Sequence, residues 1–383
     1  MKALLFANRT DSALAPLTDT SCVALLSVAC KPLIVHTVES LAMAKLTDLI
    51  VVVSSDAEAV EIALGDGTRW GMRFEYLRTA AGESEERTAE GIRDRLGDEY
   101  LVVRGEVLRT PIIADFLERS RSIGARSVVA TIGGVEAGIR LVRSEERLPE
   151  SVASRQDRAG LTNQDERIDF PGARLSSLQS LAAFHRASLD IVRGDFPGLI
   201  IPGRDVAPKV RVGRHAKFTA KAIKVVPVLI GSRCRISSTA ELCGEVLVSN
   251  DVVVDRRAVI RSSVIMPNTY IGQLVEVTNA IVAGDRLIHV DTGTVATVVD
   301  SFLLARISVA NRSFVRDLKW IVRAFAALAQ GLTWRSIKPL VISKSSYDGA
   351  WTTSSESAKD SRRRTEPEFP KQSTRIGSIG TEA

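Results

Sequence analysis

The sequence is poor in cysteine and contains no long apolar run. Its cysteines lack the paired spacing of a zinc or iron–sulfur site, so we interpret them as buried reduced thiols; they are Cys22, Cys30, Cys234 and Cys243. Residues 4–7 are too few for the apolar core of a signal peptide, and no apolar stretch reaches membrane-spanning length. These absences predict a protein of the cytoplasm.

The first 300 residues also lack the excess of positive charge that the whole chain carries. The net charge of the 383 residues is +6, whereas residues 301–383 alone hold 14 Lys and Arg against 7 Asp and Glu. The basic balance therefore belongs to the C-terminal end, and we predict no nucleic-acid partner. A hydrophobic fraction of 45% with 25% charged residues is ordinary for a globular protein, long enough here for two domains and a tail.

Residues 1–34 are predicted to hold the strand and loop around which the first domain is organised. Lys2–Phe6 is a short apolar run that leads into small and polar residues, as a buried strand leads into a loop in an α/β fold. Pro16-Leu17-Thr18 and Lys31-Pro32 follow at fixed distances. In this frame the stretch resembles the opening of the sugar-1-phosphate nucleotidylyltransferases (NDP-sugar synthases), such as mannose-1-phosphate guanylyltransferase and glucose-1-phosphate nucleotidylyltransferase. The resemblance implies a Rossmann-like nucleotidyltransferase domain.

The residues that carry the chemistry of that family are replaced. Asn8 and Arg9 stand where the family has two adjacent glycines, Val23-Ala24 stands in place of its first Lys-Pro, and its third glycine, Thr and Arg are replaced by Asp11, Ser12 and Ala13. Glycines matter there because bare backbone N–H groups must close around a triphosphate, and a Cβ obstructs that approach. The family frame is present, and its phosphate-binding residues are not.

The remainder of the first domain alternates predicted helices and strands. Leu33–Met43 and Ala57–Leu64 have helical spacing, and Asp48–Val53 is a buried strand between them. Such alternation predicts a parallel sheet with ligands at the carboxyl ends of its strands. The resemblance covers residues 1–130 and 175–300 and fades between Gly133 and Arg174, where the charged passage Glu145–Asp169 is predicted to be a loop or a sheet edge.

Two further strand ends supply candidate site residues. Gly82 stands at the family's Gly-Thr-Ala loop, and Gly105-Glu106 stands at its Gly-Asp, whose Asp is a magnesium ligand; the family's second metal Asp falls near Ser177. The resemblance therefore implies a remnant nucleotide pocket of Ala7, Asn8, Arg9, Gly82 and Gly105. Glu106 is the candidate ligand for Mg²⁺, the one cofactor implied; the alternative is a solvated acid at a strand end.

From Val212 the sequence repeats every six residues. Positions 212 to 266 in steps of six are apolar with the exception of Lys224, and the positions four residues beyond each form a second row of mostly small residues that includes Cys234. Two interlocked rows of this kind are typical of a parallel β-helix with three faces per coil. By resemblance this is the left-handed hexapeptide β-helix appended to many sugar nucleotidylyltransferases, here with about four coils ending near Val299.

Beyond the repeats, residues 309–335 are predicted to form a basic amphipathic helix and residues 347–383 a disordered tail rich in Ser, Thr, Arg and Glu. The apolar stripe within 312–332 fits the cytoplasmic face of an anionic membrane, a protein partner, or simple packing against the β-helix. With the α/β domain at 1–200 and the β-helix at 205–300, these segments complete the predicted domain order.

The favoured hypothesis is a nucleotidyltransferase-like protein with impaired catalysis. It would act in sugar-nucleotide or surface-polysaccharide biosynthesis as a homo-oligomer, a sugar-nucleotide sensor, a scaffold, or the partner of an active paralogue. The first alternative is an active sugar-1-phosphate nucleotidylyltransferase, which joins an NTP to a sugar 1-phosphate and releases pyrophosphate. The second is a hexapeptide acyltransferase that uses His215 or His289, although the regular six-residue repeat leaves no room for the inserted loop of such a cleft.

Overall fold

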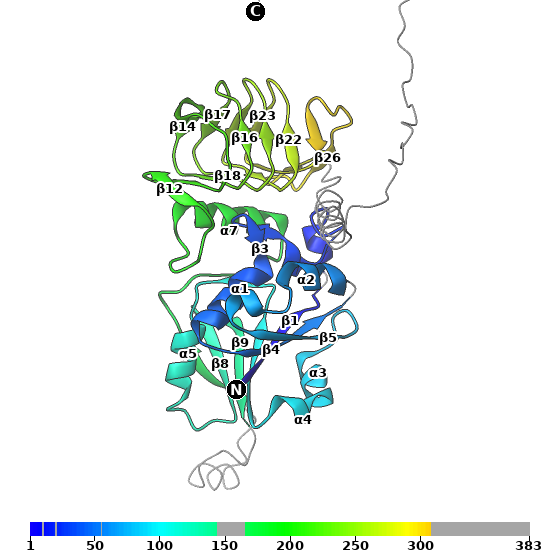
Figure 1. Cartoon of the computed structure of the whole chain (residues 1–383), viewed down its shortest axis with the longest axis vertical. Helices are drawn as coiled ribbons and strands as arrows, with labels where there is room; N and C mark the ends of the chain where they lie inside the picture. The colour runs from blue at the N-terminus through cyan, green and yellow to red at the C-terminus, as the bar shows by residue number, and fades with distance from the viewer. Residues whose placement is uncertain (10, 20, 55, 144–164, 308–383) are drawn as a thin grey trace, which may run out of the picture. The chain divides into compact units, whose positions relative to one another are not determined.

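A computed structural model provides the fold, and it describes residues 1–307 except 10, 20, 55 and 144–164. The predicted amphipathic helix at 309–335 and the predicted tail at 347–383 lie outside the described residues. Within the described part, an α/β region is followed by a region of many short strands (Figure 1). Among the described residues, no helix is both long enough and apolar enough to cross a bilayer.

A seven-stranded sheet forms the centre of the first region, in the order β10-β8-β9-β6-β1-β4-β5. All of its paired strands are parallel except β9, which is antiparallel to both of its neighbours. The seven strands are β1 (Lys2–Ala7), β4 (Asp48–Val53), β5 (Arg73–Arg78), β6 (Glu99–Arg104), β8 (Ser127–Ile132), β9 (Val135–Arg143) and β10 (Glu166–Asp169).

Both faces of this sheet are buried, which explains why β1 and β4 are continuous apolar runs. Leu5 and Ala7 pack on one face with α1 (Leu33–Met43), α2 (Ala57–Leu64) and α5 (Ile113–Ser120). Leu4 and Phe6 pack on the other face with α3 (Glu85–Gly91) and α4 (Arg93–Leu96). The predicted parallel α/β domain is therefore observed, and its single antiparallel inner strand, β9, falls in the segment where the sequence resemblance fades.

The direction of winding reverses next to β1. The chain proceeds from β1 to β4 and β5 on one side, then crosses to β6 on the other side of β1. The connections from β1 to β5 run through α1 and α2 on one face, whereas the connection from β5 to β6 runs through α3 and α4 on the opposite face. In open α/β sheets, the crevice that binds ligands lies at the carboxyl ends of the strands where the winding reverses in this way. The topology therefore favours a ligand-binding site at the ends of β1 and β6.

A second apolar core joins the sheet region to the strands that follow it. Phe184 on α7 (Leu181–Arg193) is fully buried and packs in one cluster with Leu33 and with outward-facing residues of the later strands, such as Leu229 and Leu247. The Nε2 atom of His185 lies 2.9 Å from the carbonyl oxygen of Ser262. Short elements complete this region, namely η1 (Ser12–Leu14), η2 (Val23–Leu25), β2 (Ser27–Val28), β3 (Lys31–Pro32), η3 (Thr68–Trp70), β7 (Leu108–Arg109) and β11 (Leu175–Ser176).

Residues 204–306 form what we call the three-sheet domain, because successive strands enter three sheets in rotation. We call one passage through the three sheets a coil. The first sheet contains β12 (Arg204–Ala207), β13 (Val210–Val212), β15 (Val228–Ile230), β18 (Val246–Val248), β21 (Val264–Ile265), β24 (Ala280–Ala283), β25 (Arg286–His289) and β26 (Val295–Thr297). The second contains β14 (Ile223–Val225), β17 (Glu241–Cys243), β20 (Val259–Arg261) and β23 (Glu276–Thr278), and the third contains β16 (Arg235–Ile236), β19 (Val253–Val254), β22 (Thr269–Ile271) and β27 (Leu304–Arg306). The 3-10 helix η5 (Ala220–Ala222) precedes β14, and the arrangement is compatible with the predicted β-helix.

The predicted rows of inward residues hold as far as Ile260 and then fail. Ile230 pairs with Val248, 18 residues on, but Val248 pairs with Ile265, only 17 residues on. One residue is therefore missing from the connection after β20, and Ile265, rather than the predicted Met266, enters the inner cluster. Met266 instead packs in the cluster that contains α7. The predicted inward position was therefore one residue too far along the chain.

The parallel coils also stop earlier than the predicted end near Val299. After β24 the chain turns back, and β25 and β26 add to the first sheet in antiparallel fashion. β27 similarly pairs antiparallel with β22 in the third sheet. The last parallel strand therefore ends at Ala283. The strands that follow form the antiparallel last strands of the first and third sheets.

Candidate functional site

The ends of β1 and β6 bring together the residues that the sequence marked as a remnant pocket. Gly105 follows β6, and its N–H donates to the carbonyl oxygen of Phe6 in β1 at 2.8 Å. A Cβ atom at Gly105 would lie 3.0 Å from that same oxygen and 3.1 Å from Cγ1 of Ile34. The close approach of the two strands thus favours glycine at this position, and Glu106 follows it opposite the loop after β1.

The loop after β5 closes over the same strand end. The N–H of Gly82 donates to the carbonyl oxygen of Asn8 at 3.2 Å, and the Asn8 side-chain amide donates to the carbonyl oxygen of Glu83 at 3.2 Å. Gly82 has a φ of +72°, a left-handed conformation that favours glycine. Ala7, the last residue of β1, completes the set. All six predicted site residues therefore lie around the ends of β1 and β6, although their role in nucleotide binding stays a prediction.

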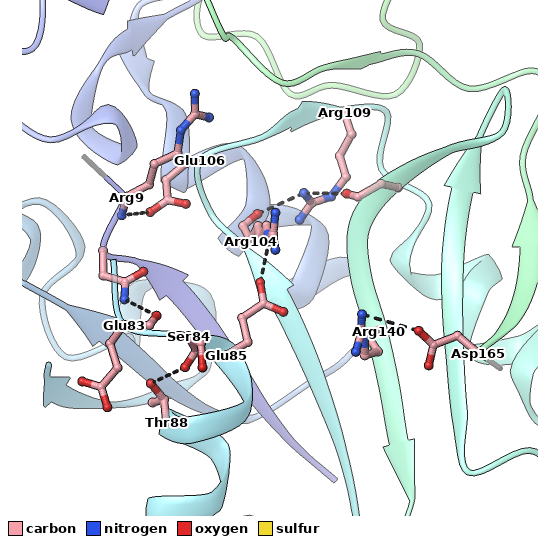
Figure 2. A network of polar contacts seen from close by, with 12 residues as sticks. Arg9, Glu83, Ser84, Glu85, Thr88, Arg104, Glu106, Arg109, Arg140 and Asp165 are labelled. Carbon is pink, nitrogen blue, oxygen red and sulfur yellow. Dashed lines mark hydrogen bonds and ion pairs between the residues drawn. The ribbon is translucent and has the colours of Figure 1, made fainter. Parts of the chain in front are cut away.

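Glu106 is a buried carboxylic acid in this crevice. Its side chain is 3% exposed, and its Oε1 atom accepts the backbone N–H of Arg9 at 2.8 Å (Figure 2). Burial raises the pKa of Glu106 to about 7, against the opposing effects of the Arg9 N–H and of the Arg9 and Arg104 charges. Near neutral pH the group is therefore divided between its protonated and ionised forms, which is not the behaviour of the solvated acid considered as an alternative.

Arg9 directs its polar groups to acceptors of the protein itself. Its guanidinium donates to the carbonyl oxygens of Ser177 at 2.8 Å and Leu178 at 3.3 Å, and it forms an ion pair with Asp11. Burial raises the pKa of Asp11, but hydrogen bonds from Arg9 and from the N–H of Ala13 outweigh it and hold that pKa below its usual value. The loop after β1 is thus tied both to Glu106 and to the segment before α7.

The described residues do not assemble a set of metal ligands at this place. No group of three or more His, Cys, Asp or Glu side chains with metal-binding geometry occurs in the part of the chain that the structure describes. Ser177, which falls near the second metal Asp of the resembled family, contributes only its carbonyl oxygen, and that oxygen accepts from Arg9. Glu85, another nearby acid, forms an ion pair with Arg104 (Figure 2).

Arg109 is a buried cation that the sequence analysis missed. It lies on β7, three residues after Glu106, and its Nη1 atom donates to the carbonyl oxygens of Arg104 at 3.0 Å and Ala137 at 3.2 Å (Figure 2). Its Nε and Nη2 atoms are buried and have no hydrogen-bond acceptor among the described residues. Burial lowers the pKa of Arg109 to about 9. A basic residue in a two-residue strand gives no sequence signal of such burial.

Other residues singled out by the sequence have structural surroundings. Lys31 forms an ion pair with Glu39, and burial lowers the pKa of Lys31 despite that partner. His215 and His289 are both exposed, and neither side chain has a hydrogen bond within the described ranges. Burial raises the pKa of the Cys22 and Cys234 thiols to about 11 and that of Cys30 further; these three are buried, Cys243 is half-buried, and all four thiols are free.

Comparison with known proteins identifies several relatives. Residues 2–137 match the family model described as nucleotidyl transferase. A glucose-1-phosphate thymidylyltransferase from Streptomyces griseus is 28% identical over 300 residues, which cover 74% of this chain and 81% of that protein. An N-acetylmuramate alpha-1-phosphate uridylyltransferase from Neisseria meningitidis is 38% identical over 28% of this chain and 48% of its own length. A low-salt glycan biosynthesis nucleotidyltransferase from Haloferax volcanii is 27% identical over 50% of this chain and 51% of its own length.

Proposed function

We propose that this chain, whose N-terminal domain is of the sugar-1-phosphate nucleotidyltransferase type, is a catalytically impaired relative that serves sugar-nucleotide or surface-polysaccharide biosynthesis as a regulatory, sugar-nucleotide-binding or scaffold subunit. The observation that carries this proposal is that the polar groups of Arg9 are already bound to acceptors within the protein. Its N–H is bound to Glu106 and its guanidinium to Ser177, Leu178 and Asp11. Donors that are already satisfied inside the protein stabilise an incoming triphosphate poorly, because their present partners must first be given up.

Magnesium is the cofactor implied for such a transferase, and the described residues fit it poorly. Glu106 offers one carboxylate, half-neutralised near pH 7, with one oxygen already engaged by Arg9. Mg²⁺ prefers an octahedral set of oxygen ligands supplied by one or two carboxylates together with substrate phosphates and water. We therefore derive no catalytic step through a metal ion, and we expect any Mg²⁺ that binds to arrive with a nucleotide.

The three-sheet domain suits the role of an assembly module. We infer that it is a left-handed parallel β-helix, supported by the rotation of successive strands through three sheets and by the inward rows of small and bulky residues. Such a domain offers flat outer faces, and we propose that it joins copies of this chain or an active paralogue. A cytoplasmic location agrees with the biosynthetic activities that the relatives' names state.

The deciding experiment pairs calorimetric titration with a pyrophosphate-release assay on the full chain. We expect binding of an NDP-sugar without Mg²⁺-dependent binding of an NTP. We also expect pyrophosphate release to be at least about a thousandfold below that of an active thymidylyltransferase assayed in parallel, because several phosphate contacts are missing together. Robust release with any pairing of NTP and sugar 1-phosphate would contradict the proposal. Failure of every nucleotide and sugar nucleotide to bind would leave only the scaffold role.

The second candidate is an active sugar-1-phosphate nucleotidyltransferase. It is favoured by the extent of the similarity to the Streptomyces griseus enzyme and by the carboxylate of Glu106 at the end of β6. Under this alternative, Arg9→Ala and Glu106→Ala both abolish Mg²⁺-dependent NTP binding, whereas Arg87→Ala, an exposed arginine on α3, leaves it unchanged. If all three variants bind NTP as the unaltered protein does, the second candidate is wrong.

A further inference from the structure

The first coil of the three-sheet domain is strongly basic. Residues 204–226, which we call the basic coil, contain seven Lys and Arg but only one acidic residue, Asp205. Outside the basic coil, the first 300 residues are on balance acidic. The cations of the basic coil are Arg204, Lys209, Arg211, Arg214, Lys217, Lys221 and Lys224.

Most of these cations have no ionic partner among the residues that the structure describes. Arg211 pairs with Asp205, and the Nζ of Lys224 lies 3.7 Å from a carboxylate oxygen of Glu241. The other five are exposed and form no ion pair within the described ranges. The next coil carries fewer cations, and of these Arg233 is paired with Asp251 while Arg235 is exposed. Within the described residues, most of the positive charge of the basic coil is therefore not neutralised by an acidic side chain.

The five unpaired cations are spread around one end of the domain rather than along one face. Arg204 and Lys209 belong to the β12–β13 hairpin in the first sheet. The backbone of Lys217 pairs with that of Arg235, in the third sheet, through a single parallel β-bridge. Lys221 lies in η5, next to the second sheet. Figure 1 shows β12 and β14 at one end of the three-sheet domain and β26 at the other. A surface that meets the cations of the hairpin, Lys217 and Lys221 together must lie across this end of the domain.

Exposed apolar side chains accompany this charge. Val206 on β12 is 43% exposed, and Val225 and Val226, at the corner after β14, are 53% and 43% exposed. The hairpin and the corner are adjacent, because the N–H of Val228 donates to the carbonyl oxygen of Lys209 at 2.9 Å. Large apolar residues exposed beside lysines are typical of protein surfaces that enter the interfacial layer of a bilayer.

From this placement we propose that the basic coil docks the protein on a membrane surface that carries anionic phospholipids. A planar surface can contact the β12–β13 hairpin, Lys217 and η5 at the same time, whereas a linear polyanion can contact only one of them at a time. Lipid phosphates supply the negative charge that the five cations lack, and the valines at the corner reach the apolar boundary. Each basic residue close to an anionic membrane contributes about 1 kcal/mol to binding, roughly a fivefold change in affinity.

Co-sedimentation with vesicles of phosphatidylcholine containing roughly a third phosphatidylglycerol tests this proposal on the full chain. Lys209→Glu, Lys217→Glu and Lys221→Glu are combined in one variant. The matched control combines Arg87→Glu, Arg93→Glu and Arg121→Glu, three exposed arginines of the sheet region, and so makes the same change of net charge. The C-terminal residues are identical in both variants, so their own contribution to binding cancels.

We expect the basic-coil variant to bind the anionic vesicles at least about tenfold more weakly than the unaltered protein, and the control to stay within about twofold. Val226→Ser should weaken binding by about threefold without changing its salt dependence. An equal loss in both charge variants, or no loss in either, would overturn the proposal. Preference for a soluble anionic polysaccharide over the vesicles would overturn it as well. If the Glu variant does not fold, the same positions changed to Gln should show a smaller loss in the same order.

Discussion

The crevice at the ends of β1 and β6 differs from the interior of the three-sheet domain in the interactions that hold its residues in place. In the three-sheet domain, inward positions are apolar because each coil must fill the space against the next, and Ile230, Val248 and Ile260 are each fully buried. In the crevice, packing fixes only Gly105, whereas Asn8, Arg9 and Glu106 are held by hydrogen bonds to one another and to nearby carbonyl oxygens. A fold can therefore persist while the polar groups at its strand ends change partners.

The two regions therefore differ in the amino-acid substitutions that they tolerate. An inward residue of the three-sheet domain is constrained by contacts on all sides, so its replacement costs stability whatever the function. A crevice residue is constrained less by packing and more by its polar contacts, such as the hydrogen bond between Arg9 and Glu106. The following changes test this contrast in order of decreasing effect.

The largest loss is expected at an inward position of the three-sheet domain. Ile260→Ala removes a fully buried side chain and should lower the free energy of unfolding by about 2–5 kcal/mol through lost burial and a residual cavity. Lys224→Ala, at an exposed position of the same six-residue row, is the matched control and should stay within about 0.5 kcal/mol. Urea unfolding measures both, and equal losses would mean that the row does not define the interior.

The next effect is a pH dependence set by Glu106. Because its folded pKa is raised from 4.5 to about 7, the native state binds more protons than the unfolded state between these values, and stability falls as pH rises through this window. Glu106→Gln retains the acceptor for the Arg9 N–H and should gain up to about 3 kcal/mol over the unaltered protein at pH 8, with little gain at pH 4.5. Glu86→Gln, an exposed change on α3, is the matched control and should stay within about 0.5 kcal/mol, and urea unfolding at both pH values measures the two variants.

A gain in stability is expected from removing the buried charge of Arg109. Arg109→Met keeps most of the side-chain volume and removes a cation whose Nε and Nη2 have no acceptor among the described residues. Replacing a poorly paired buried charge by an apolar residue is often stabilising, here by about 1–3 kcal/mol. Arg104→Met, which breaks the half-exposed pair with Glu85, should change stability by less than about 1 kcal/mol. A loss at Arg109 in thermal unfolding would show that its two carbonyl contacts outweigh the cost of burial.

The smallest effect is expected at Arg9. Arg9→Met removes the hydrogen bonds to the Ser177 and Leu178 carbonyl oxygens while leaving the backbone N–H bound to Glu106, and should cost about 1–2 kcal/mol. Arg69→Met, which loses an exposed contact with the Trp70 ring, is the control and should cost less. A cost at Arg9 no greater than at Arg69 would mean that the loop is not held by its side chain, contrary to the contrast drawn above.

The sequence predicted those parts of the structure that are governed by periodicity. Leu33–Met43 and Asp48–Val53 form the predicted helix and strand, and the resemblance to sugar-1-phosphate nucleotidyltransferases is confirmed. The strand β9 was missed because its alternating Arg and apolar residues lie where the family frame is lost. The loss of one residue before Val264 could not be detected in the two rows of six-residue spacing. The positions at which these rows predict inward residues, Val264 and Met266, are both apolar, so the rows continue without a visible break.

The positions of the site residues were predictable, but their contacts were not. The frame placed Arg9 and Glu106 at adjacent strand ends, which the hydrogen bond between them agrees with. That the Arg9 guanidinium reaches the carbonyl oxygens of Ser177 and Leu178 depends on a segment some 168 residues away, whose path no local pattern specifies. Arg109 gave no signal because burial of a cation is decided by the surrounding fold and not by spacing.

The apolar core that α7 shares with both regions has a consequence for how the protein is made. Leu14, Val23 and Leu33 emerge from the ribosome early, yet they share that core with residues as late as Ile288. At ordinary rates of translation, the interval between Leu33 and Ile288 lasts roughly 10–50 s. During that time the sheet can form its own core while this second apolar surface stays uncovered. The nascent chain therefore presents a binding surface for chaperones that the finished protein does not have.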